Sequence, residues 1–430
     1  MSEWDTAALA AADKRYVWHP FTPMGEWCAS EHEPIVLVRG EGALLWDSNG
    51  REYIDGNASI WTNIHGHNHP HINAAIRRQL ERVAHTSFLG FTNPPAIELA
   101  RAVVNLFPAG TLSRVFYSDD GSTGIEVALR IVAQFWSING DSRPDFVAFK
   151  SGYHGDTAGA ASLGAAAMFQ KNGSRWSFPV RQVGSVAQLE ALDSEDQAKI
   201  AAVVIEPLVQ GAAGIRLWPS GTLSGLRRWC DRSGCLLIAD EVLTGFGRTG
   251  RMFACEQEAV IPDIMVLGKG LTGGYLPLSI TLISDKIFRP FSSDETDPEI
   301  LFYGHSYAGN ALGCAAALAS LELFEIEQTL AALSDKIGHL SAELSRLKEH
   351  PAVAEIRQCG LMAGIELRAD RSERIGAEAC LAARAHGLLT RPIGNTVVLM
   401  PPLCVAASQI NRAVAAVRNA IDEVCCAARR

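Results

Sequence analysis

Two charged residues, Asp240 and Lys269, lie just beyond two short apolar runs of the sequence. The runs are Leu236–Ala239 and Ile264–Leu267. Runs of this length, rich in Ile, Leu and Val, are typical of strands that are buried on both faces of a parallel sheet. Because open α/β sheets bind their ligands at the carboxyl ends of the strands, we expect the carboxylate and the amine to lie at one edge.

A lysine and a carboxylate at such an edge suit pyridoxal 5'-phosphate (PLP). The amine of Lys269 can form a Schiff base with the aldehyde, and the carboxylate of Asp240 can keep the ring nitrogen protonated, so that the ring accepts electrons. On these two residues alone, a structural ion pair between strand ends is the simpler interpretation. Other residues must therefore decide whether the edge holds a cofactor.

The turn Asp119–Gly124 could hold a phosphate. It joins a predicted strand, Arg114–Tyr117, to a predicted amphipathic helix, and it places Gly121 and Ser122 at the helix start. Free backbone N–H groups and the positive end of the helix attract anions there. The Walker pattern and the dinucleotide pattern G-x-G-x-x-G are both missing. Most turns of this kind bind nothing, and a nucleotide-binding α/β protein that uses the turn without PLP is the alternative from another functional class.

Three further residues follow predicted strands at the same edge. Tyr153 and His154 come after the strand Phe146–Phe149, and Glu206 comes after Ala202–Ile205. An aromatic ring at this position could stack on a planar cofactor, whereas the simpler alternative is a surface turn that contains a tyrosine. The sequence thus directs an aromatic ring, an imidazole and two carboxylates toward the predicted lysine.

Histidines at positions 65, 67, 69 and 71 invite a metal-site interpretation. Zinc sites usually combine Cys and His at spacings that a helix or finger imposes, and this segment lacks such spacing. Gly66 and Pro70 instead predict a loop. We therefore predict no metal site.

Composition limits the class of protein and its compartment. The chain has 430 residues, a formal net charge of −9 and ten scattered cysteines. The negative charge argues against nucleic acid as a main partner. The sequence contains no apolar run of membrane-helix length and no signal peptide at its start, so we expect no membrane association. Scattered cysteines without a C-x-x-C pattern are typical of reduced thiols, so we expect a cytoplasmic protein.

The length predicts more than one domain, and the pattern of elements suggests where they divide. We expect an N-terminal segment (1–64), a large domain (65–320) and a smaller C-terminal α+β domain (321–430). The periodicity predicts strands and helices on both sides of the second boundary. The strands are Ile35–Arg39, Ala43–Asp47, Ser279–Ile283, Val353–Arg357, Leu361–Leu367, Leu388–Arg391 and Thr396–Met400, and the helices are 72–83, Ala311–Phe324, Leu330–Leu347, Ala377–His386 and Ala407–Ala427.

Nine short motifs occur in one order along the chain: WHPFT, IHGHNHP, DDGS, GYHGDT, IEPLVQGAAG, ADEVLTGFGRTG, LGKGLTGGY, GHSYAGN and TRP. With this set the chain resembles the class III PLP-dependent aminotransferases of fold type I, essentially from end to end. The resemblance implies a large domain with a mostly parallel central sheet and a small domain built from both chain ends. It also implies PLP as the cofactor and a homodimer whose subunits share their active sites.

The resemblance assigns roles to individual residues. Lys269 would bind PLP and move the proton, and Asp240 would pair with the ring nitrogen. Gly121 and Ser122 would hold the phosphate, and Tyr153 would stack on the ring and border the substrate. The remaining cofactor contacts would come from His154, Glu206, and, toward the neighbouring subunit's cofactor, His305 and Ser306. The predicted substrate contacts are Phe21, Ile60, Trp61, Tyr153, Lys269, Gly304 and Arg391, the last gripping a carboxylate through its guanidinium group.

Within the family, the chain resembles most closely the branch that aminates 8-amino-7-oxononanoate to 7,8-diaminononanoate in biotin biosynthesis. Leu243 stands where ornithine- and aminobutyrate-type relatives carry glutamine, which favours this branch. An ω-amino-acid or diamine:pyruvate transaminase is the alternative. The resemblance implies S-adenosylmethionine or lysine as the amino donor. Phe21 lacks a hydroxyl and Ile60 lacks an indole that adenosylmethionine-using enzymes provide, so these residues slightly favour lysine.

Overall fold

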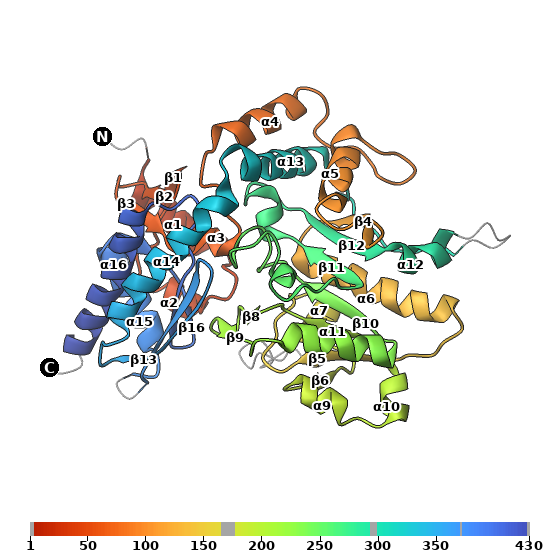
Figure 1. The fold of residues 1–430 in the computed structure, drawn as a ribbon. Helices are drawn as coiled ribbons and strands as arrows, with labels where there is room; N and C mark the ends of the chain where they lie inside the picture. The colour runs from red at the N-terminus through yellow and green to blue at the C-terminus, as the bar shows by residue number, and fades with distance from the viewer. Residues whose placement is uncertain (1–3, 165–176, 293–298, 370–371, 428–430) are drawn as a thin grey trace.

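A seven-stranded sheet forms the centre of the computed structural model, which describes residues 4–164, 177–292, 299–369 and 372–427 (Figure 1). All pairings are parallel except those of β12, which runs antiparallel to both of its neighbours. The mostly parallel sheet expected from the sequence is confirmed. In spatial order the strands are β4 (Leu112–Ser118), β12 (Ser279–Ser284), β11 (Ile264–Leu267), β10 (Leu236–Asp240), β7 (Ile200–Ile205), β5 (Asp145–Phe149) and β6 (Arg181–Val183).

The central strands are buried on both faces because their residues alternate between two cores. Leu237 and Met265 pack into one apolar cluster, whereas Leu236 and Ile264 pack into the other. Helix α6 (Gly121–Ile138) covers the second face, and α5 (Pro94–Val104) and α11 (Thr222–Ser233) contribute to the first. Such double coverage explains why these strands carry uninterrupted apolar runs and no polar alternation.

The strand register brings three polar side chains to one edge. Ala239 lies opposite Ile205 of β7 and also opposite Met265 of β11. Glu206 and Asp240 therefore stand at neighbouring strand ends, and Lys269 follows β11 two residues past its end. This arrangement fixes the site at the carboxyl edge of the sheet.

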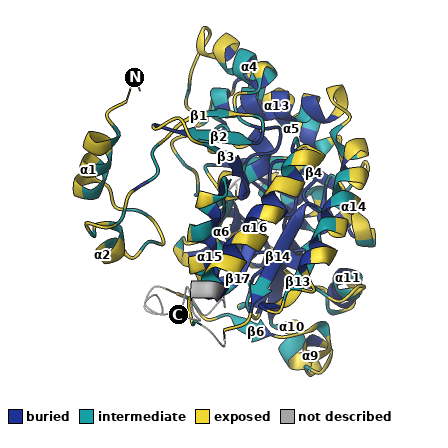
Figure 2. Ribbon diagram, turned by 90° about the vertical axis from the view of Figure 1, so that its left-hand side faces the viewer, coloured by how far each residue is buried: buried dark blue, intermediate teal, exposed yellow. Residues whose placement is uncertain are grey.

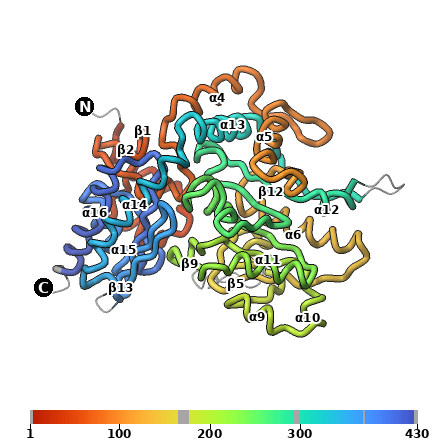
Figure 3. The backbone as a smooth tube through the Cα atoms, in the orientation of Figure 1, coloured from red at the N-terminus to blue at the C-terminus, as the bar shows by residue number. Residues whose placement is uncertain are grey.

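Segments from the two chain ends lie together on one side of the molecule (Figures 1 and 3). The short strand β15 (Leu388–Leu389) pairs in parallel with β3 (Glu52–Asp55), which completes a sheet with β1 (Leu37–Glu41) and β2 (Leu44–Asp47). A second, antiparallel sheet lies beside α14 (Thr329–Leu347), α15 (Ile375–Ala385) and α16 (Ala407–Ala427). Its strands are β13 (Val353–Cys359), β14 (Met362–Leu367), β17 (Thr396–Leu399) and β16 (Pro392–Ile393).

The remaining helices are mostly short and lie outside the three sheets described above. Figure 2 shows that α1 and α2 present largely exposed residues, whereas the strands beneath α15 and α16 are buried. None of the described helices is long and apolar enough to cross a membrane. The other elements are α1 (Thr6–Tyr16), α2 (Met24–Trp27), α3 (Ala58–Trp61), α4 (Pro70–Leu80), α7 (Ala158–Leu163), α9 (Val186–Glu190), α10 (Ser194–Ala198), η2 (Ala254–Glu258), η3 (Lys269–Thr272), α12 (Asp285–Phe288), η4 (Arg289–Ser292), α13 (Ala311–Ile326) and the hairpin of β8 (Val209–Gln210) and β9 (Arg216–Leu217).

Several boundaries predicted from the sequence are wrong, among them those of the strand predicted for Ile35–Arg39, which the structure places at Leu37–Glu41. The helix predicted for 72–83 ends at Leu80, because the chain tightens into a turn in which Gln79 bonds the carbonyl of Val83. The strand predicted for Leu388–Arg391 ends at Leu389, because the chain there leaves β3 and continues to the strand of another sheet. Arg391 is therefore an exposed residue between the two sheets.

Candidate active site

A cavity of about 740 Å³ opens at the carboxyl ends of β7, β10 and β11. Most of the residues predicted for catalysis or cofactor binding line it together, although they come from segments far apart in the sequence. They are Gly121, Ser122, Tyr153, His154, Glu206, Asp240 and Lys269, and the predicted substrate contact Trp61 lines the cavity with them. The edge predicted from the strand pattern thus forms one chamber large enough for a small planar cofactor and part of a substrate.

Lys269 is the only predicted nucleophile in the described lining of this cavity, and its backbone is strained. Gly268 is extended, and Lys269 then adopts a φ of 39° as the first residue of η3. Its Nζ lies 4.9 Å from the centre of the Trp61 ring. Burial lowers the pKa of Lys269, and the charges of Asp240 and Glu206 oppose this shift only in part. A lowered pKa increases the fraction of free amine, which is the form that attacks a carbonyl group.

Asp240 forms a buried ion pair with His154. Oδ2 of Asp240 lies 2.7 Å from Nδ1 of His154, and Oδ1 accepts a hydrogen bond from the N–H of Val242 at 3.1 Å. Only 5% of Asp240 and 4% of His154 is exposed. Burial disfavours the imidazolium form, but the hydrogen bond and charge of Asp240, helped by Glu206, outweigh burial and raise the pKa of His154. The pair therefore holds a carboxylate in a fixed orientation at the end of β10.

Glu206 supports the loop that carries Tyr153. Its two carboxyl oxygens accept hydrogen bonds from the N–H groups of Tyr153 (3.0 Å) and Gly211 (2.9 Å). Burial raises the pKa of Glu206 to about 7, with His154 opposing the shift and Asp240 adding to it. At neutral pH this carboxyl group can therefore hold or release a proton.

The start of α6 forms the predicted phosphate seat. Asp120 caps the helix by accepting a hydrogen bond from the N–H of Thr123 at 2.8 Å, which leaves Gly121 and Ser122 in the first turn, where helices have no internal partners for N–H groups. A Cβ on Gly121 would lie 2.5 Å from Cγ1 of Val242. Glycine is therefore required for the helix start to approach the segment after β10 this closely.

The loop after β5 contains Asp156 and Thr157, two residues to which the sequence analysis gave no role. The hydroxyl of Tyr153 donates to Asp156 at 2.9 Å, and burial, followed by the charge of Asp156, raises the pKa of Tyr153. Oγ of Ser122 accepts hydrogen bonds from the N–H groups of Asp156 and Thr157, each at 2.9 Å. The motif GYHGDT contained both residues, and a carboxylate three positions after a tyrosine was a signal for this contact.

Trp61 and Leu243 form an apolar wall of the cavity. Both side chains are buried, with 8% and 6% exposed, and they pack in one cluster with Val209 and Met362. Leu243 cannot donate or accept a hydrogen bond, so this wall offers contact area to an apolar part of a ligand. Thr62 and Tyr275, which the sequence analysis also missed, line the chamber beside this wall.

Six residues predicted to contact substrate or cofactor do not line the cavity of this chain. Phe21 and Ile60 are 60% and 44% exposed, and Arg391 is exposed too. Nδ1 of His305 lies 3.0 Å from Asp119, which does line the cavity. Their predicted contacts, including those with a neighbouring subunit, stay predictions. The six are Phe21, Ile60, Gly304, His305, Ser306 and Arg391.

Three of the four histidines of the loop pair with different carboxylates, and the fourth is buried. His67 pairs with Asp55, His69 with Glu327 and His71 with Glu322, at 2.9, 2.9 and 2.6 Å. His65 is buried, and burial lowers its pKa to about 3. Within the described parts of the chain, no three His, Cys, Asp or Glu side chains are grouped to hold a metal ion.

Comparison with known proteins relates this site to one family. The family described as aminotransferase class-III matches residues 28–421. A protein of Geobacter sulfurreducens named adenosylmethionine-8-amino-7-oxononanoate aminotransferase is 42% identical over 453 residues, covering 99% of this chain and 99% of that protein. A protein of Nitratidesulfovibrio vulgaris with the same name is 46% identical over 449 residues, covering 97% of this chain and 82% of that protein.

Solved structures give the same relationship. The crystal structure of adenosylmethionine-8-amino-7-oxononanoate aminotransferase from Methanocaldococcus jannaschii has a TM-score of 0.93 and 37% identity, and the match covers 97% of this chain and 99% of that one. An (S)-enantioselective omega-transaminase from Thermomicrobium roseum has a TM-score of 0.90 and 32% identity, with 98% and 99% covered. The chain therefore belongs to the class III aminotransferases, and it is a PLP-dependent aminotransferase.

Proposed function

We propose that this enzyme transfers an amino group to 8-amino-7-oxononanoate and so makes 7,8-diaminononanoate for biotin biosynthesis. The observation that carries the proposal is the identity of 42–46% over nearly the whole chain to two relatives named for this acceptor. The fold alone does not select the substrate, because an omega-transaminase matches it almost as well. Leu243 in the cavity wall supports the proposal against ornithine- and aminobutyrate-type relatives, since those carry a glutamine at this position.

The residues around the cavity fit PLP. The partly buried amine of Lys269 would carry the covalent link, and the carboxylate of Asp240 would pair with the ring nitrogen. The N–H groups of Gly121 and Ser122 at the positive end of α6 would hold the phosphate. Tyr153 would stack on the ring. When bound, PLP supplies an aldehyde that condenses with amines and a ring that withdraws electrons from the carbon beside the bound nitrogen.

Each side chain of the site then has a defined task. Nζ of Lys269, with its pKa lowered by burial, accepts the proton from the substrate carbon and donates it again later in the amino transfer. Asp240 keeps a negative charge at a fixed place because His154 holds it at 2.7 Å. Glu206 fixes the backbone of Tyr153 and thereby its ring. These tasks divide proton transfer, electrostatic stabilisation and orientation among separate residues.

The acceptor has a carboxylate at one end of an apolar chain, so its site needs a cation and an apolar slot. We propose Arg391 as the cation, because a guanidinium group binds a carboxylate through two parallel hydrogen bonds. Trp61 and Tyr153 line the slot, and Phe21 would close it from outside. Gly304 would contribute a backbone contact.

We propose S-adenosylmethionine as the amino donor. The names of the relatives in Geobacter and Nitratidesulfovibrio support this choice. Lysine is the second candidate, favoured by the absence of a hydroxyl at Phe21 and of an indole at Ile60. Both of these side chains are exposed at the surface of this chain, so their effect on the donor depends on contacts outside the described cavity.

We further propose a cytoplasmic homodimer. Exposed apolar side chains support a second subunit, since Leu89 and Phe302 are 82% and 85% exposed. The side chain of His85 bonds the carbonyl of Ser306, which brings the segment of Leu89 close to that of Phe302. His305 and Ser306 would then act on the partner's cofactor. We also propose the division into 1–64 with 321–430 as the small domain and 65–320 as the large domain, which the pairing of β3 with β15 supports.

The decisive experiment incubates the purified enzyme with 8-amino-7-oxononanoate and one donor at a time. Formation of 7,8-diaminononanoate, measured by mass spectrometry, is expected with S-adenosylmethionine. The Lys269→Ala variant serves as the inactive control. Turnover of ω-amino acids with pyruvate, without turnover of 8-amino-7-oxononanoate, would replace the proposal by the alternative within the family.

A further inference from the structure

Four consecutive residues other than glycine form a left-handed turn beside the cavity. Ala58, Ser59, Ile60 and Trp61 have φ values of 43°, 52°, 70° and 72°. In this region the Cβ of an L-residue crowds the following carbonyl group, and a β-branched residue such as isoleucine is rarely found there. Such a conformation persists only where the surrounding structure holds it, and it occurs most often at functional sites.

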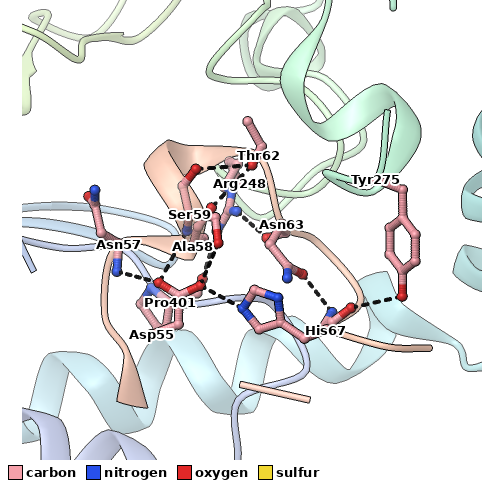
Figure 4. Close-up of polar contacts among 11 residues, drawn as sticks. Asp55, Asn57, Ala58, Ser59, Thr62, Asn63, His67, Arg248, Tyr275 and Pro401 are labelled. Atoms are coloured by element: carbon pink, nitrogen blue, oxygen red, sulfur yellow. Dashed lines mark hydrogen bonds and ion pairs between the residues drawn. The ribbon is translucent and has the colours of Figure 1, made fainter. Parts of the chain in front are cut away.

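The carboxylate of Asp55 holds this turn from within (Figure 4). Its Oδ1 accepts hydrogen bonds from the N–H groups of Asn57 at 3.3 Å and Ser59 at 3.1 Å. Its Oδ2 accepts the hydroxyl of Ser59 at 3.1 Å and lies 2.9 Å from Nε2 of His67. The Asp55 side chain is only 3% exposed, so water does not compete with these contacts. One carboxylate thus accepts three hydrogen bonds at the start of the turn, from the N–H groups of Asn57 and Ser59 and from the Ser59 hydroxyl.

Asp55 is itself fixed by the C-terminal part of the chain. It is the last residue of β3, where it lies opposite Leu389 of β15. The next residue, Gly56, donates its N–H to Leu389 at 2.9 Å and accepts the N–H of Met400 at 2.7 Å. A Cβ on Gly56 would lie 2.5 Å from Leu388, so only glycine allows this contact. The backbone that carries the carboxylate is therefore fixed by β15 and by Met400.

The far end of the turn is fixed by a buried arginine. Arg248 donates to the carbonyl of Asn63 at 2.5 Å and to that of Pro401 at 2.7 Å (Figure 4). Asn63 in turn donates its N–H to the carbonyl of Ala58. The turn is thus held at its start by Asp55 and at its end by Arg248, and neither end can relax alone.

The turn directs two adjacent side chains to different environments. The indole N–H of Trp61 donates to the side chain of Asn57 at 2.9 Å, and its ring lies 4.9 Å from Nζ of Lys269. Trp61 is 8% exposed, whereas the preceding Ile60 is 44% exposed. The strained backbone is therefore the feature that puts the tryptophan ring into the wall of the cavity.

We propose that Asp55, together with His67, is a positioning residue that holds the left-handed turn 58–61 and thereby sets the ring of Trp61 against Lys269. His67 belongs to the histidine-rich loop that the sequence analysis left without a role. The part of the inference that concerns substrate binding rests on the proposed function, but the part that concerns the tryptophan does not.

The test compares Asp55→Asn with two glycine substitutions in the same background. Asparagine keeps the shape of Asp55 but replaces one accepting oxygen by an amide that donates. We expect the KM for the amino acceptor to rise on the order of tenfold, since the conformational strain of one residue corresponds to about a tenfold change in an equilibrium constant. In the enzyme without cofactor, we expect acrylamide to quench the fluorescence of Trp61 more strongly, taking Trp61→Phe as the reference for the other tryptophans.

Rescue separates positioning from general stability. Ser59→Gly relieves the strain at one of the four left-handed residues, so Asp55→Asn with Ser59→Gly should regain part of the lost quenching protection and KM. Gln328→Gly is the matched control, because Gln328 has a φ of 50° at the start of α14, outside the described cavity. It should raise the melting temperature without restoring either property.

Several outcomes would overturn the inference. Unchanged quenching and KM in Asp55→Asn, with only a lower melting temperature, would leave Asp55 a purely structural residue. Equal rescue by both glycine substitutions would have the same meaning. If Asp55→Asn does not fold, His67→Gln removes one of the contacts and should shift quenching in the same direction by less; no shift refutes the inference. If 8-amino-7-oxononanoate is not a substrate, the quenching result still decides.

Discussion

Replacing Asp240 by asparagine tests the buried carboxylate of the site with almost no change of shape. An amide cannot hold the ring nitrogen protonated, so the electron-withdrawing power of the cofactor falls. We expect kcat to fall on the order of a thousandfold, which corresponds to about 4 kcal/mol in the activation barrier. PLP should stay bound, because Lys269 and the start of α6 are unchanged.

The same substitution removes the partner of His154. The 2.7 Å contact is a charged, buried hydrogen bond, and its loss should lower the free energy of unfolding by about 1.5–3 kcal/mol. Because Asp240 raises the pKa of His154, the pair's contribution to stability is complete below the ordinary imidazole pKa of about 6.5 and is lost as the pH rises through the raised value. The stability difference between wild type and variant should therefore be largest on the acidic side.

Asp47→Asn is the matched control. Asp47 is 6% exposed and accepts hydrogen bonds from Asn49, Arg51 and Tyr53, but it does not line the cavity. It should lose stability and keep its kcat. The measurements are steady-state rates and urea unfolding at about pH 6 and about pH 8. A kcat within tenfold of wild type in PLP-loaded Asp240→Asn would remove Asp240 from the catalytic site.

Three further substitutions test other parts of the site. Lys269→Ala should abolish transamination while changing the melting temperature little, because a buried amine with a lowered pKa adds little stability; residual turnover near the wild-type rate would refute its role. A carboxyl group whose pKa is raised to about 7 stabilises the fold below its unfolded pKa of about 4.5, and this contribution is lost as the pH rises through about 7. In Glu206→Gln the free energy of unfolding should therefore decrease less between about pH 4.5 and about pH 7 than in the wild type, by at most about 3 kcal/mol. The same decrease in variant and wild type would contradict the burial argument. Phe21→Tyr with Ile60→Trp should shift kcat/KM toward S-adenosylmethionine over lysine by about ten- to a hundredfold, through one hydrogen bond and one aromatic stack, and no shift would mean that these positions do not select the donor.

The central sheet could be predicted from the sequence because its strands are short and apolar on both faces. The strand β11 has the bounds Ile264–Leu267 that the apolar run predicted, and β10 extends its run only by Asp240. The parallel register then places Glu206, Asp240 and Lys269 at one edge without further information. Local pattern was sufficient here, since the residues of both apolar runs are buried in the two apolar clusters on either face of the sheet.

Features that depend on distant segments could not be predicted. Helix α11 is not one of them, because its buried residues Leu223, Leu226 and Trp229 follow helical spacing that the sequence analysis did not use. Strand β15 is two residues long and exists because β3 lies beside it. The hydrogen bonds of Ser122 to the loop of Thr157 likewise join segments that the sequence separates by more than thirty residues. The residue pattern of one segment does not predict which distant segment it will pair with, or in which register.

The turn 58–61 shows the same limit where it affects function. The residues Ala-Ser-Ile-Trp contain no glycine, so propensity predicts ordinary helix or extended backbone and not a left-handed turn. Contacts from Arg248 and from strand β15 override that preference. A comparison of residue types at positions 60 and 61 treats them as two neighbouring stacking surfaces, but the backbone places only Trp61 in the cavity wall and leaves Ile60 44% exposed. An indole at position 60 can therefore affect the choice of donor only if the donor, or a second subunit, reaches beyond the cavity to meet it.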